Sequence, residues 1–203
     1  MKYSLVALVA TVVAGSSVKA EEWVPLFNGK DTDRWTIEGE AMAEVVDGVL
    51  IGRQKSEKGG NLFTEAEYDN FELRFSHKVD WPANSGVWFR YRKSGYQFDI
   101  LKYKKPVAFS GTLYCPGKMF ITSNLDESIE NRDGWNGGRI HANGNHLALW
   151  LNGKKVGECR DDTHTRGKIG IQIHGGKQFA EMAIRIRMME IRPLGPDDTP
   201  PAD

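Results

Sequence analysis

The sequence predicts an all-β protein whose two antiparallel sheets pack as a β-sandwich of the jelly-roll type. Two observations support this fold class: apolar and polar residues alternate along several segments, and short turn motifs separate those segments. Alternation places one face of each strand in a core and the other face outside it. The segments with the clearest alternation are residues 71–79, 145–151, 168–174 and 183–188. No long segment has a helical period, and residues 124–132 hold a short helix at most.

Turn motifs mark where neighbouring strands are joined. Leu151 to Val156 is predicted to be a hairpin, because Asn152-Gly153 supplies the positive φ angles of a tight two-residue turn. Asp47-Gly48 marks another turn, directly before a strand that begins at Val49. Many short strands joined in this way are typical of an antiparallel sandwich or jelly roll.

Length and charge restrict the function classes. The chain has 203 residues, with 27 basic and 27 acidic side chains. This length suits one domain, expected over residues 21–194, and the proline-containing residues 195–203 are expected to form a flexible tail. A net charge near zero argues against nucleic acid and against electrostatic binding to a membrane, because both need a basic surplus.

The first 20 residues have the features of a secretory signal peptide. Lys2 gives a short charged start, an apolar run extends from Leu5 to Ala14, and Val18-Lys19-Ala20 places small residues where a signal peptidase reads. The apolar run is too short to cross a bilayer, although an uncleaved N-terminal anchor is the alternative. We therefore expect an extracytoplasmic protein, periplasmic or secreted, with no membrane attachment once the signal is removed.

The cysteines and histidines show no metal-binding motif. The sequence does not show whether its two cysteines pair, Cys115 and Cys159. Three histidines are expected to lie at the surface or to be hydrogen-bonded: His77, His141 and His146. Residues 161–164 are expected to form a polar loop, with a bound cation as the alternative. A divalent cation bound by oxygen atoms from distant parts of the chain leaves no local motif, so the sequence does not decide whether the protein binds one. The sequence does not decide the oligomeric state either.

Strand parity sorts the side chains of three predicted strands. In the first strand, one face holds Val87, Phe89 and Tyr91, and the other holds Trp88, Arg90 and Arg92. In the second, one face holds Phe98 and Ile100, and the other holds Gln97 and Asp99. In the third, one face holds Ile169, Ile171 and Ile173, and the other holds Gln172 and His174. The isoleucine face of the third strand is expected to be core.

If these strands share one sheet, its outer face gathers six side chains: Trp88, Arg90, Gln97, Asp99, Gln172 and His174. An aromatic platform beside planar amides, a carboxylate and a guanidinium is the usual composition of a sugar-binding site. The alternative is that any solvated sheet face carries polar groups of this kind.

Several short motifs follow one another over residues 22–194. They are residues 24–31 with Trp35, then 47–50, 68–73, 84–90, 95–96, 111–114, 134–136, 150–153 and 170–175. In this order they resemble the 3-keto-disaccharide hydrolase domain family. The ordered set, rather than any single motif, carries the resemblance.

The resemblance implies a laminin G-like, concanavalin A-like jelly roll and an enzyme that acts on glycosides already oxidised at C3 of a sugar ring. A ketone at C3 acidifies the hydrogen on C2. A base removes that proton, an enolate forms, the glycosidic oxygen leaves C1, and water then adds. Such a reaction needs one positioned base and a group that stabilises the enolate oxygen.

Each predicted site residue is expected to have a defined role in that reaction. His174 is the expected base, because histidine titrates near neutral pH. Arg90 is the expected clamp for the enolate oxygen, because its guanidinium is always charged. Asp99 is expected either to orient the imidazole or to act as the base itself. The expected substrate-binding residues are Trp88, Asn84, Gln97, Gln172 and Lys102.

One strand departs from the family pattern. Where the family has Tyr-Glu-Val-Gln-Ile-Leu-Asp, this chain has Tyr-Gln-Phe-Asp-Ile-Leu-Lys at residues 96–102. The usual Glu is Gln97, the usual Gln is Asp99, and the usual Asp is Lys102. Two carboxylates are lost and one is gained, so this strand decides how far the family's activity transfers.

The alternatives are two other functions that act on carbohydrates. Ordinary glycoside hydrolysis needs two carboxylates at a fixed separation. Sandwich glucanases carry such acidic residues along one strand, whereas Glu65, Glu67 and Asp69 of this chain are expected to precede a strand. The main alternative is a non-catalytic carbohydrate-binding module of the same fold. The altered strand favours the module, whereas Arg90, Gln172 and His174 favour the enzyme. In both cases the expected partner is a carbohydrate.

Overall fold

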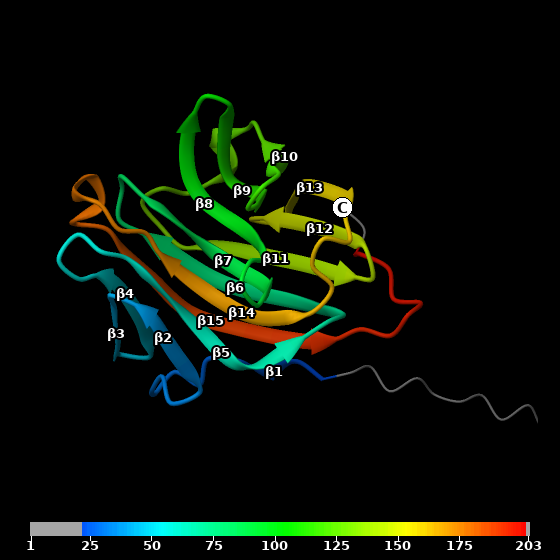
Figure 1. The fold of residues 1–203 in the computed structure, drawn as a ribbon, viewed down its shortest axis with the longest axis horizontal. Coiled ribbons are helices and arrows are strands. Elements are labelled where there is room, and N and C mark those ends of the chain that lie inside the picture. Colours follow the sequence, from blue (N-terminus) through cyan, green and yellow to red (C-terminus); the bar gives the residue numbers. More distant parts are fainter. Residues whose placement is uncertain (1–21, 202–203) are drawn as a thin grey trace, which may run out of the picture.

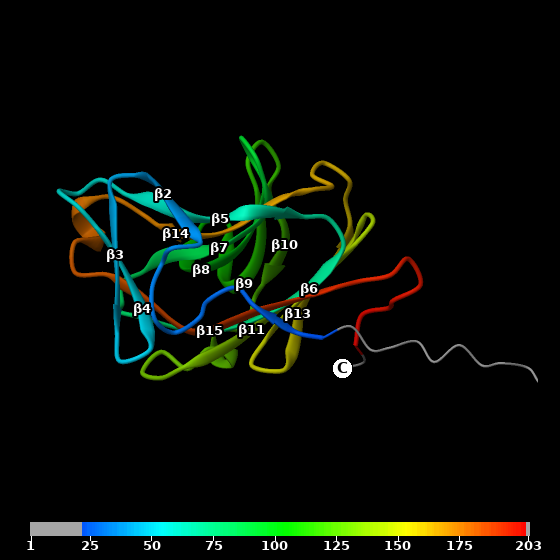
Figure 2. The ribbon, with the colours of Figure 1, turned by 90° about the horizontal axis from the view of Figure 1, so that it is seen from below.

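The computed structural model describes residues 22–201 as two β-sheets stacked face to face (Figures 1 and 2). Strand pairing is antiparallel in both sheets, so the predicted fold class is confirmed. The expected signal peptide lies outside the described residues and stays a prediction. Within residues 22–201, no helix is long and apolar enough to cross a membrane.

The first sheet has eight strands and the second has seven. The first runs in the order β13 (Lys154–Arg160), β12 (His146–Leu151), β11 (Asn136–Asn143), β6 (Phe71–Val79), β15 (Ala183–Pro193), β4 (Val49–Gln54) and β3 (Ala41–Val46), and β1 (Val24–Pro25) also pairs with β15. The second runs in the order β10 (Met119–Asn124), β9 (Val107–Cys115), β8 (Tyr96–Lys104), β7 (Asn84–Tyr91), β14 (Gly167–Ile173), β5 (Gly60–Tyr68) and β2 (Trp35–Gly39). Strands β8, β7 and β14 are neighbours, which brings together segments far apart in the sequence.

Alternate residues of the strands build the core between the sheets. Phe75 of β6, Val87 of β7 and Phe98 of β8 belong to this buried apolar cluster. Gln97 and Asp99 flank Phe98 on the same strand, so their side chains point away from the first sheet. We call the surface to which they point the outer face of the second sheet.

The turn motifs form the predicted hairpins. Asn152 and Gly153 have φ angles of 51° and 82°, and they join β12 to β13. Asp47 and Gly48 have φ angles of 51° and 77°, and they join β3 to β4. The segment 124–132 holds only a single 3₁₀ turn at Glu127–Ile129, as expected.

Two histidines are buried. His77 and His141 are both 0% exposed. The ring nitrogens of His77 have no hydrogen-bond partner among the described residues, whereas His141 Nδ1 lies 3.7 Å from Glu72 Oε1. The expectation of a surface or hydrogen-bonded histidine is wrong for His77, because its side chain lies on the same face of β6 as the core residue Phe75. Burial lowers the pKa of His77 to about 3. His146 meets the expectation, with Nε2 2.7 Å from Glu158 Oε1.

The cysteines and the C-terminal segment complete the described chain. Cys115 and Cys159 are free thiols. Residues 195–201 form no strand, and the Asn143 side chain donates hydrogen bonds to the carbonyl oxygens of Gly195 (3.0 Å) and Asp198 (2.9 Å). These bonds connect the start of the tail to β11, and its flexibility stays a prediction.

Candidate active site

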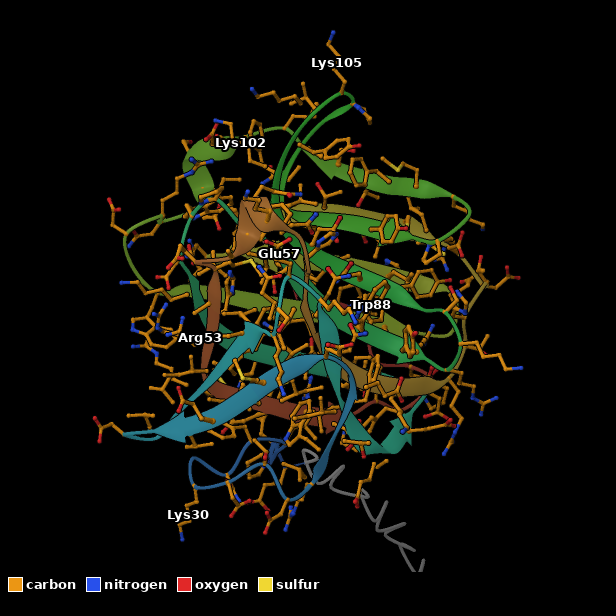
Figure 3. The ribbon with its side chains drawn as sticks, turned by 60° about the vertical axis from the view of Figure 1, so that its left-hand side comes forward. Lys30, Arg53, Glu57, Trp88, Lys102 and Lys105 are labelled. Carbon is orange, nitrogen blue, oxygen red and sulfur yellow. The ribbon has the colours of Figure 1, made fainter. Side chains whose placement is uncertain are left out.

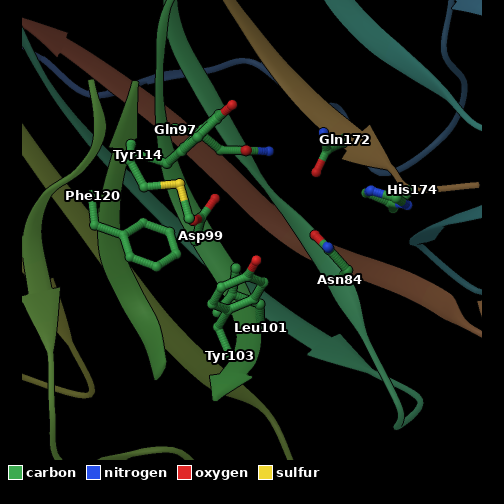
Figure 4. A pocket seen from close by; sticks show the side chains of 10 residues that line it. Asn84, Gln97, Asp99, Leu101, Tyr103, Tyr114, Phe120, Gln172 and His174 are labelled. Carbon is green, nitrogen blue, oxygen red and sulfur yellow. The ribbon is translucent and has the colours of Figure 1, made fainter. Parts of the chain in front are cut away.

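A pocket of about 230 Å³ opens on the outer face of the second sheet. Strands β7, β8, β9, β10 and the end of β14 supply its lining (Figure 4). The lining residues are Asn84, Gln97, Asp99, Leu101, Tyr103, Tyr114, Met119, Phe120, Gln172 and His174. Five residues predicted from strand parity or family motifs therefore share one pocket: Asn84, Gln97, Asp99, Gln172 and His174.

Gly86 lies on the strand between the two strands that carry Asp99 and Gln172. It pairs with Asp99 of β8 on one side and with Gln172 of β14 on the other. Two strand spacings separate those neighbours, which leaves roughly 10 Å between the strands that carry them. A Cβ atom at Gly86 would lie 2.7 Å from both Cγ and Nε2 of Gln97, so glycine at this position lets the Gln97 side chain lie over β7.

Asp99 is a buried carboxyl with no protein partner. Its residue is 3% exposed, and the described residues offer it neither a hydrogen bond nor a salt bridge. Burial raises the pKa of Asp99 well above its ordinary value of 3.8. The protonated, neutral acid is therefore favoured, and that form donates a hydrogen bond as well as accepting one.

Three amide side chains surround this carboxyl. Gln97 is 2% exposed, and its Nε2 has no hydrogen-bond partner among the described residues. Gln172 and Asn84 line the same pocket, and neither amide is engaged with a protein group in the described part of the chain. Buried polar groups normally find partners, so this cluster is built to hydrogen-bond a polar ligand.

His174 lies directly after β14, on the opposite side of the pocket from Asp99 (Figure 4). Its Nδ1 is 2.6 Å from the carbonyl oxygen of Gly175. A carbonyl oxygen only accepts, so Nδ1 donates and the neutral ring keeps its lone pair on Nε2. The Phe179 ring packs edge-on at 5.3 Å and fixes the imidazole plane. Because Asp99 does not contact the imidazole, the carbonyl of Gly175 orients it instead.

Trp88 lies beside the pocket on the same outer face. Its indole Nε1 donates a 2.9 Å hydrogen bond to Asn61 Oδ1. Its ring is 6.2 Å from Tyr114, which is 6.4 Å from Phe120. Phe120 is in turn 5.6 Å from Tyr103. Four aromatic rings thus form a continuous strip along one side of the pocket.

Arg90 does not share the outer face with Trp88, so the parity prediction is wrong at this residue. Arg90 has a φ of 50°, and the register between β7 and β14 shifts here, which is a β-bulge. The bulge turns the guanidinium to the end of the sandwich, where it is buried. There it donates to the backbone oxygens of Asp69, Gly144 and His164. These contacts hold three loops together.

Lys102 also lies outside the pocket. Its Nζ is 2.8 Å from Glu127 Oε1, and it points away from the face that holds Gln97 and Asp99. Successive side chains of a strand point to opposite faces, and Lys102 is three residues after Asp99, so the two side chains lie on opposite faces of β8. Figure 3 shows Lys102 and Trp88 well separated on the molecule.

Several pocket residues were missed by the sequence reasoning. Leu101 and Tyr103 have the same parity as Asp99, so reading β8 two and four residues further finds them. Tyr114, Met119 and Phe120 come from β9 and β10, and no short motif marks them. Their place depends on the order of strands in the sheet, which alternation alone does not give.

A second hollow adjoins the pocket. It measures about 420 Å³ and shares Gln172 and His174 with the pocket. Its remaining lining is polar or backbone: Glu38, Gly39, Gly59, Gly60, Asn61, Ile173 and Gly175. The end of β14 therefore separates two open regions of different character.

A metal centre is not evident in the described structure. Residues 22–201 contain no group of three or more His, Cys, Asp or Glu side chains placed to hold a metal ion. In the loop at 161–164, Asp161 instead accepts hydrogen bonds from Tyr96, Thr163 and Lys118. These bonds lower the pKa of Asp161 and fix the loop.

Solved structures share this architecture at low sequence identity. A proposed glycosyl hydrolase from Parabacteroides distasonis is 18% identical, with 85% of this chain and 94% of that chain covered at a TM-score of 0.66. A galectin-like protein from Bacillus subtilis is 15% identical, with coverage of 85% and 94% and a TM-score of 0.67. A carbohydrate-binding module from the same species is 15% identical, with coverage of 77% and 95% and a TM-score of 0.58. Among curated proteins, none matches the chain.

Fold and pocket together define a galectin-like jelly-roll domain with a polar pocket on one sheet. The chain belongs to the family of 3-keto-alpha-glucoside-1,2-lyase-like domains, whose family model matches residues 22–192. The family expected from the ordered motifs is thus confirmed, and the match extends over nearly all of the described residues.

Proposed function

We propose that this protein cleaves 3-keto glycosides by base-assisted elimination followed by hydration. One observation carries the proposal: His174, with its proton held at Nδ1, faces a buried carboxyl across a pocket of unpaired amides. Ordinary glycoside hydrolysis requires two carboxylates, whereas Asp99 is the one carboxyl that lines this pocket. Elimination instead needs a base, His174, to remove a proton and a neutral acid, Asp99, to donate a hydrogen bond to the enolate oxygen.

In the proposed first step, His174 Nε2 takes the proton from C2 of the sugar. The C2–H electron pair forms the enolate between C2 and C3, and the negative charge develops on the C3 oxygen. Protonated Asp99 donates a hydrogen bond to that oxygen, which replaces the clamp expected from Arg90. A neutral carboxylic acid in an apolar site is an established kind of oxyanion donor.

In the second step, the enolate collapses. The C3 carbonyl re-forms, a C1=C2 double bond forms, and the C1–O bond breaks. The leaving oxygen takes the proton from the His174 imidazolium and departs as an alcohol. Water then adds across the double bond, with OH at C1 and H at C2, so the net reaction is hydrolysis. Gln97, Gln172 and Asn84 hold the sugar hydroxyls during both steps.

A turnover assay tests this proposal. The protein is incubated with a 3-keto glucoside and with its unoxidised parent, each with and without an added divalent metal. Cleavage of the keto form alone is expected, because only the ketone makes C2–H acidic. Equal cleavage of both forms contradicts the mechanism.

A non-catalytic carbohydrate-binding module is the second candidate function. The observation that favours it is the aromatic strip beside Asp99, since such strips also serve sugar binding without chemistry. A module binds glycans with no turnover and no pH optimum, so the same assay with a binding measurement separates the two functions.

We also propose that residues 1–20 direct export. The support is the charged start, short apolar run and small residues before position 21. N-terminal sequencing of the protein from fractionated cells tests this. A mature chain that starts at Glu21 in the extracytoplasmic fraction is expected, and a cytoplasmic chain with an intact N-terminus contradicts it.

A further inference from the structure

We infer that the pocket selects glycosides with an aromatic aglycone, which is the non-sugar group released from C1. The inference rests on the proposed function, because the polar residues of the pocket place the sugar. The aglycone would lie on four residues that we call the apolar wall: Leu101, Tyr103, Met119 and Phe120.

Strand β8 leads directly from the polar part of the pocket to the apolar wall. Gln97, Asp99, Leu101 and Tyr103 follow one another on the same face. Two residues of a strand advance by roughly 7 Å, about the length of one sugar ring. A group attached to a sugar that sits at Asp99 therefore reaches Leu101 and then Tyr103. Figure 4 shows Tyr103 and Phe120 away from Gln172 and His174.

The chemistry of the wall fits an aromatic ring better than a second sugar. The Tyr103 and Phe120 rings meet edge-on at 5.6 Å, and the only N or O atom in the four wall side chains is the Tyr103 hydroxyl. A second sugar would bring several hydroxyls against this surface, where they would lose water and gain almost no partners. An aromatic aglycone instead buries apolar area and packs against the two rings.

The exposed fraction of the side chains rises from the polar part of the pocket to the apolar wall. Asp99 is 3% exposed, whereas Tyr103 and Met119 at the rim are each 41% exposed. Large apolar side chains exposed next to a buried polar cluster match a ligand with a polar deep end and an apolar outer end. The second hollow, lined by Glu38, Asn61 and glycine backbone, offers no such apolar surface.

A comparison of benzyl and methyl 3-keto-glucosides tests the inference in both anomers. Benzyl and methyl alcohols are leaving groups of similar basicity, so a difference in kcat/KM reports on binding of the aglycone rather than on its chemistry. We expect kcat/KM for the benzyl glycoside to exceed that for the methyl glycoside by about tenfold or more. Equal values for the two glycosides overturn the inference.

Variants of the wall locate the effect. Tyr103→Ala and Phe120→Ala are expected to bring the benzyl-to-methyl ratio of kcat/KM close to one, because the benzyl glycoside loses the ring contacts that the methyl glycoside does not make. Leu125→Ala is the matched control, because Leu125 is 69% exposed and lies outside the pocket lining. An equal loss for both glycosides in the wall variants would mean that the wall holds the sugar, which overturns the inference.

Failure of the proposed function is recognised separately. If no 3-keto glycoside is cleaved, the elimination mechanism fails. Calorimetric titration with unoxidised benzyl and methyl glucosides then decides the inference alone. Tighter binding of the benzyl glucoside that is lost in Tyr103→Ala supports an aromatic-aglycone site, and equal binding of both glucosides overturns it.

Discussion

Asp99 and Gln172 lie on either side of Gly86, and both pair with this glycine in the register of the second sheet. Three neighbouring strands thus carry an acid, a glycine and an amide. A Cβ atom on this glycine would lie 2.7 Å from both Cγ and Nε2 of Gln97, so the Gln97 side chain lies over Gly86. The position of Gln97 in the pocket therefore depends on the side chain that Gly86 lacks.

Gly86→Ala is expected to displace the Gln97 side chain from its place in the pocket. The added Cβ would lie 2.7 Å from Gln97 Cγ and from the Phe98 carbonyl oxygen, so the backbone must shift. We expect a stability loss of about 1–3 kcal/mol in thermal unfolding and a loss of glycoside binding by calorimetry. Gly137→Ala is the control, because nothing lies within 4 Å of its new Cβ. Normal binding by Gly86→Ala would show that glycoside binding does not depend on the position of Gln97.

Substitutions of Asp99 distinguish a hydrogen-bond donor from a base. Asp99→Ala removes the donor and is expected to lower kcat by about 10²–10³-fold, the usual effect of losing one oxyanion donor. Asp99→Asn keeps an N–H donor and is expected to retain much more activity than Asp99→Ala. Steady-state kinetics on a 3-keto glucoside measure both variants. If Asp99→Asn is as inactive as Asp99→Ala, Asp99 acts as the base.

The pH profile gives an independent measure of the same residue. Burial raises the pKa of Asp99, and the proposed role needs the protonated form. Activity should therefore be present below the raised pKa and fall as pH rises through it. In Asp99→Asn this alkaline fall in kcat should disappear, because the amide does not titrate. An unchanged alkaline limb in that variant would assign the fall to another group.

Removal of the imidazole tests the base. His174→Gln is expected to lower kcat by about 10²–10⁴-fold, because general base catalysis contributes on this scale. His146→Gln is the control, since His146 pairs with Glu158 outside the pocket. Circular dichroism confirms the fold of each variant. Turnover by His174→Gln at the unsubstituted rate would remove His174 from the mechanism.

Arg90 is expected to matter for stability rather than chemistry. Its buried guanidinium donates to the backbone oxygens of three loops, and Arg90→Leu leaves those oxygens without partners. We expect a loss of about 3 kcal/mol or more in denaturant unfolding. Arg92→Leu is the exposed control. Well below the unfolding transition, kcat of Arg90→Leu should be unchanged, and a large fall in kcat would return Arg90 to the reaction.

His77 should make the fold sensitive to mild acid. Burial lowers the pKa of His77 to about 3, from an ordinary value of 6.5 that applies in the unfolded chain. Between these values the unfolded chain binds a proton that the folded chain does not. The contribution of His77 to the free energy of unfolding should therefore fall below pH 6.5, by at most ~1.4 kcal/mol per pH unit. Glu130 contributes with the opposite sign in this range, because burial raises its pKa to about 7.

Replacement of the buried imidazole checks that prediction. Relative to the unsubstituted protein, His77→Leu should lose less free energy of unfolding as the pH is lowered from 6.5 to 5, as measured by urea unfolding at each pH. This window lies above the pKa of Glu72, which its arginine and histidine partners lower to about 2 against the cost of burial. An unchanged slope would show that His77 gains a proton or a partner in the folded state.

Much of the fold and part of the site follow from local pattern. Alternation places Gln97 and Asp99 on the strand face opposite to that of Phe98, whatever the position of the strand in the sheet. The Asn-Gly turn at 152–153 is likewise recognised from its own two residues. The bulge at Arg90 is different, because it depends on the register with β14, a segment about 80 positions away. The same holds for Tyr114 and Phe120, whose strands reach the pocket only through sheet order.

The most direct test of the account follows the hydrogen on C2. A 3-keto glucoside is cleaved by the protein in D₂O, and the released sugar is examined by NMR, with an enzyme-free sample to correct for spontaneous exchange. Elimination and hydration predict one solvent deuterium at C2 in every product molecule, and loss of this labelled product in His174→Gln. A product that keeps its original hydrogen at C2 would contradict proton abstraction, and with it the proposed mechanism.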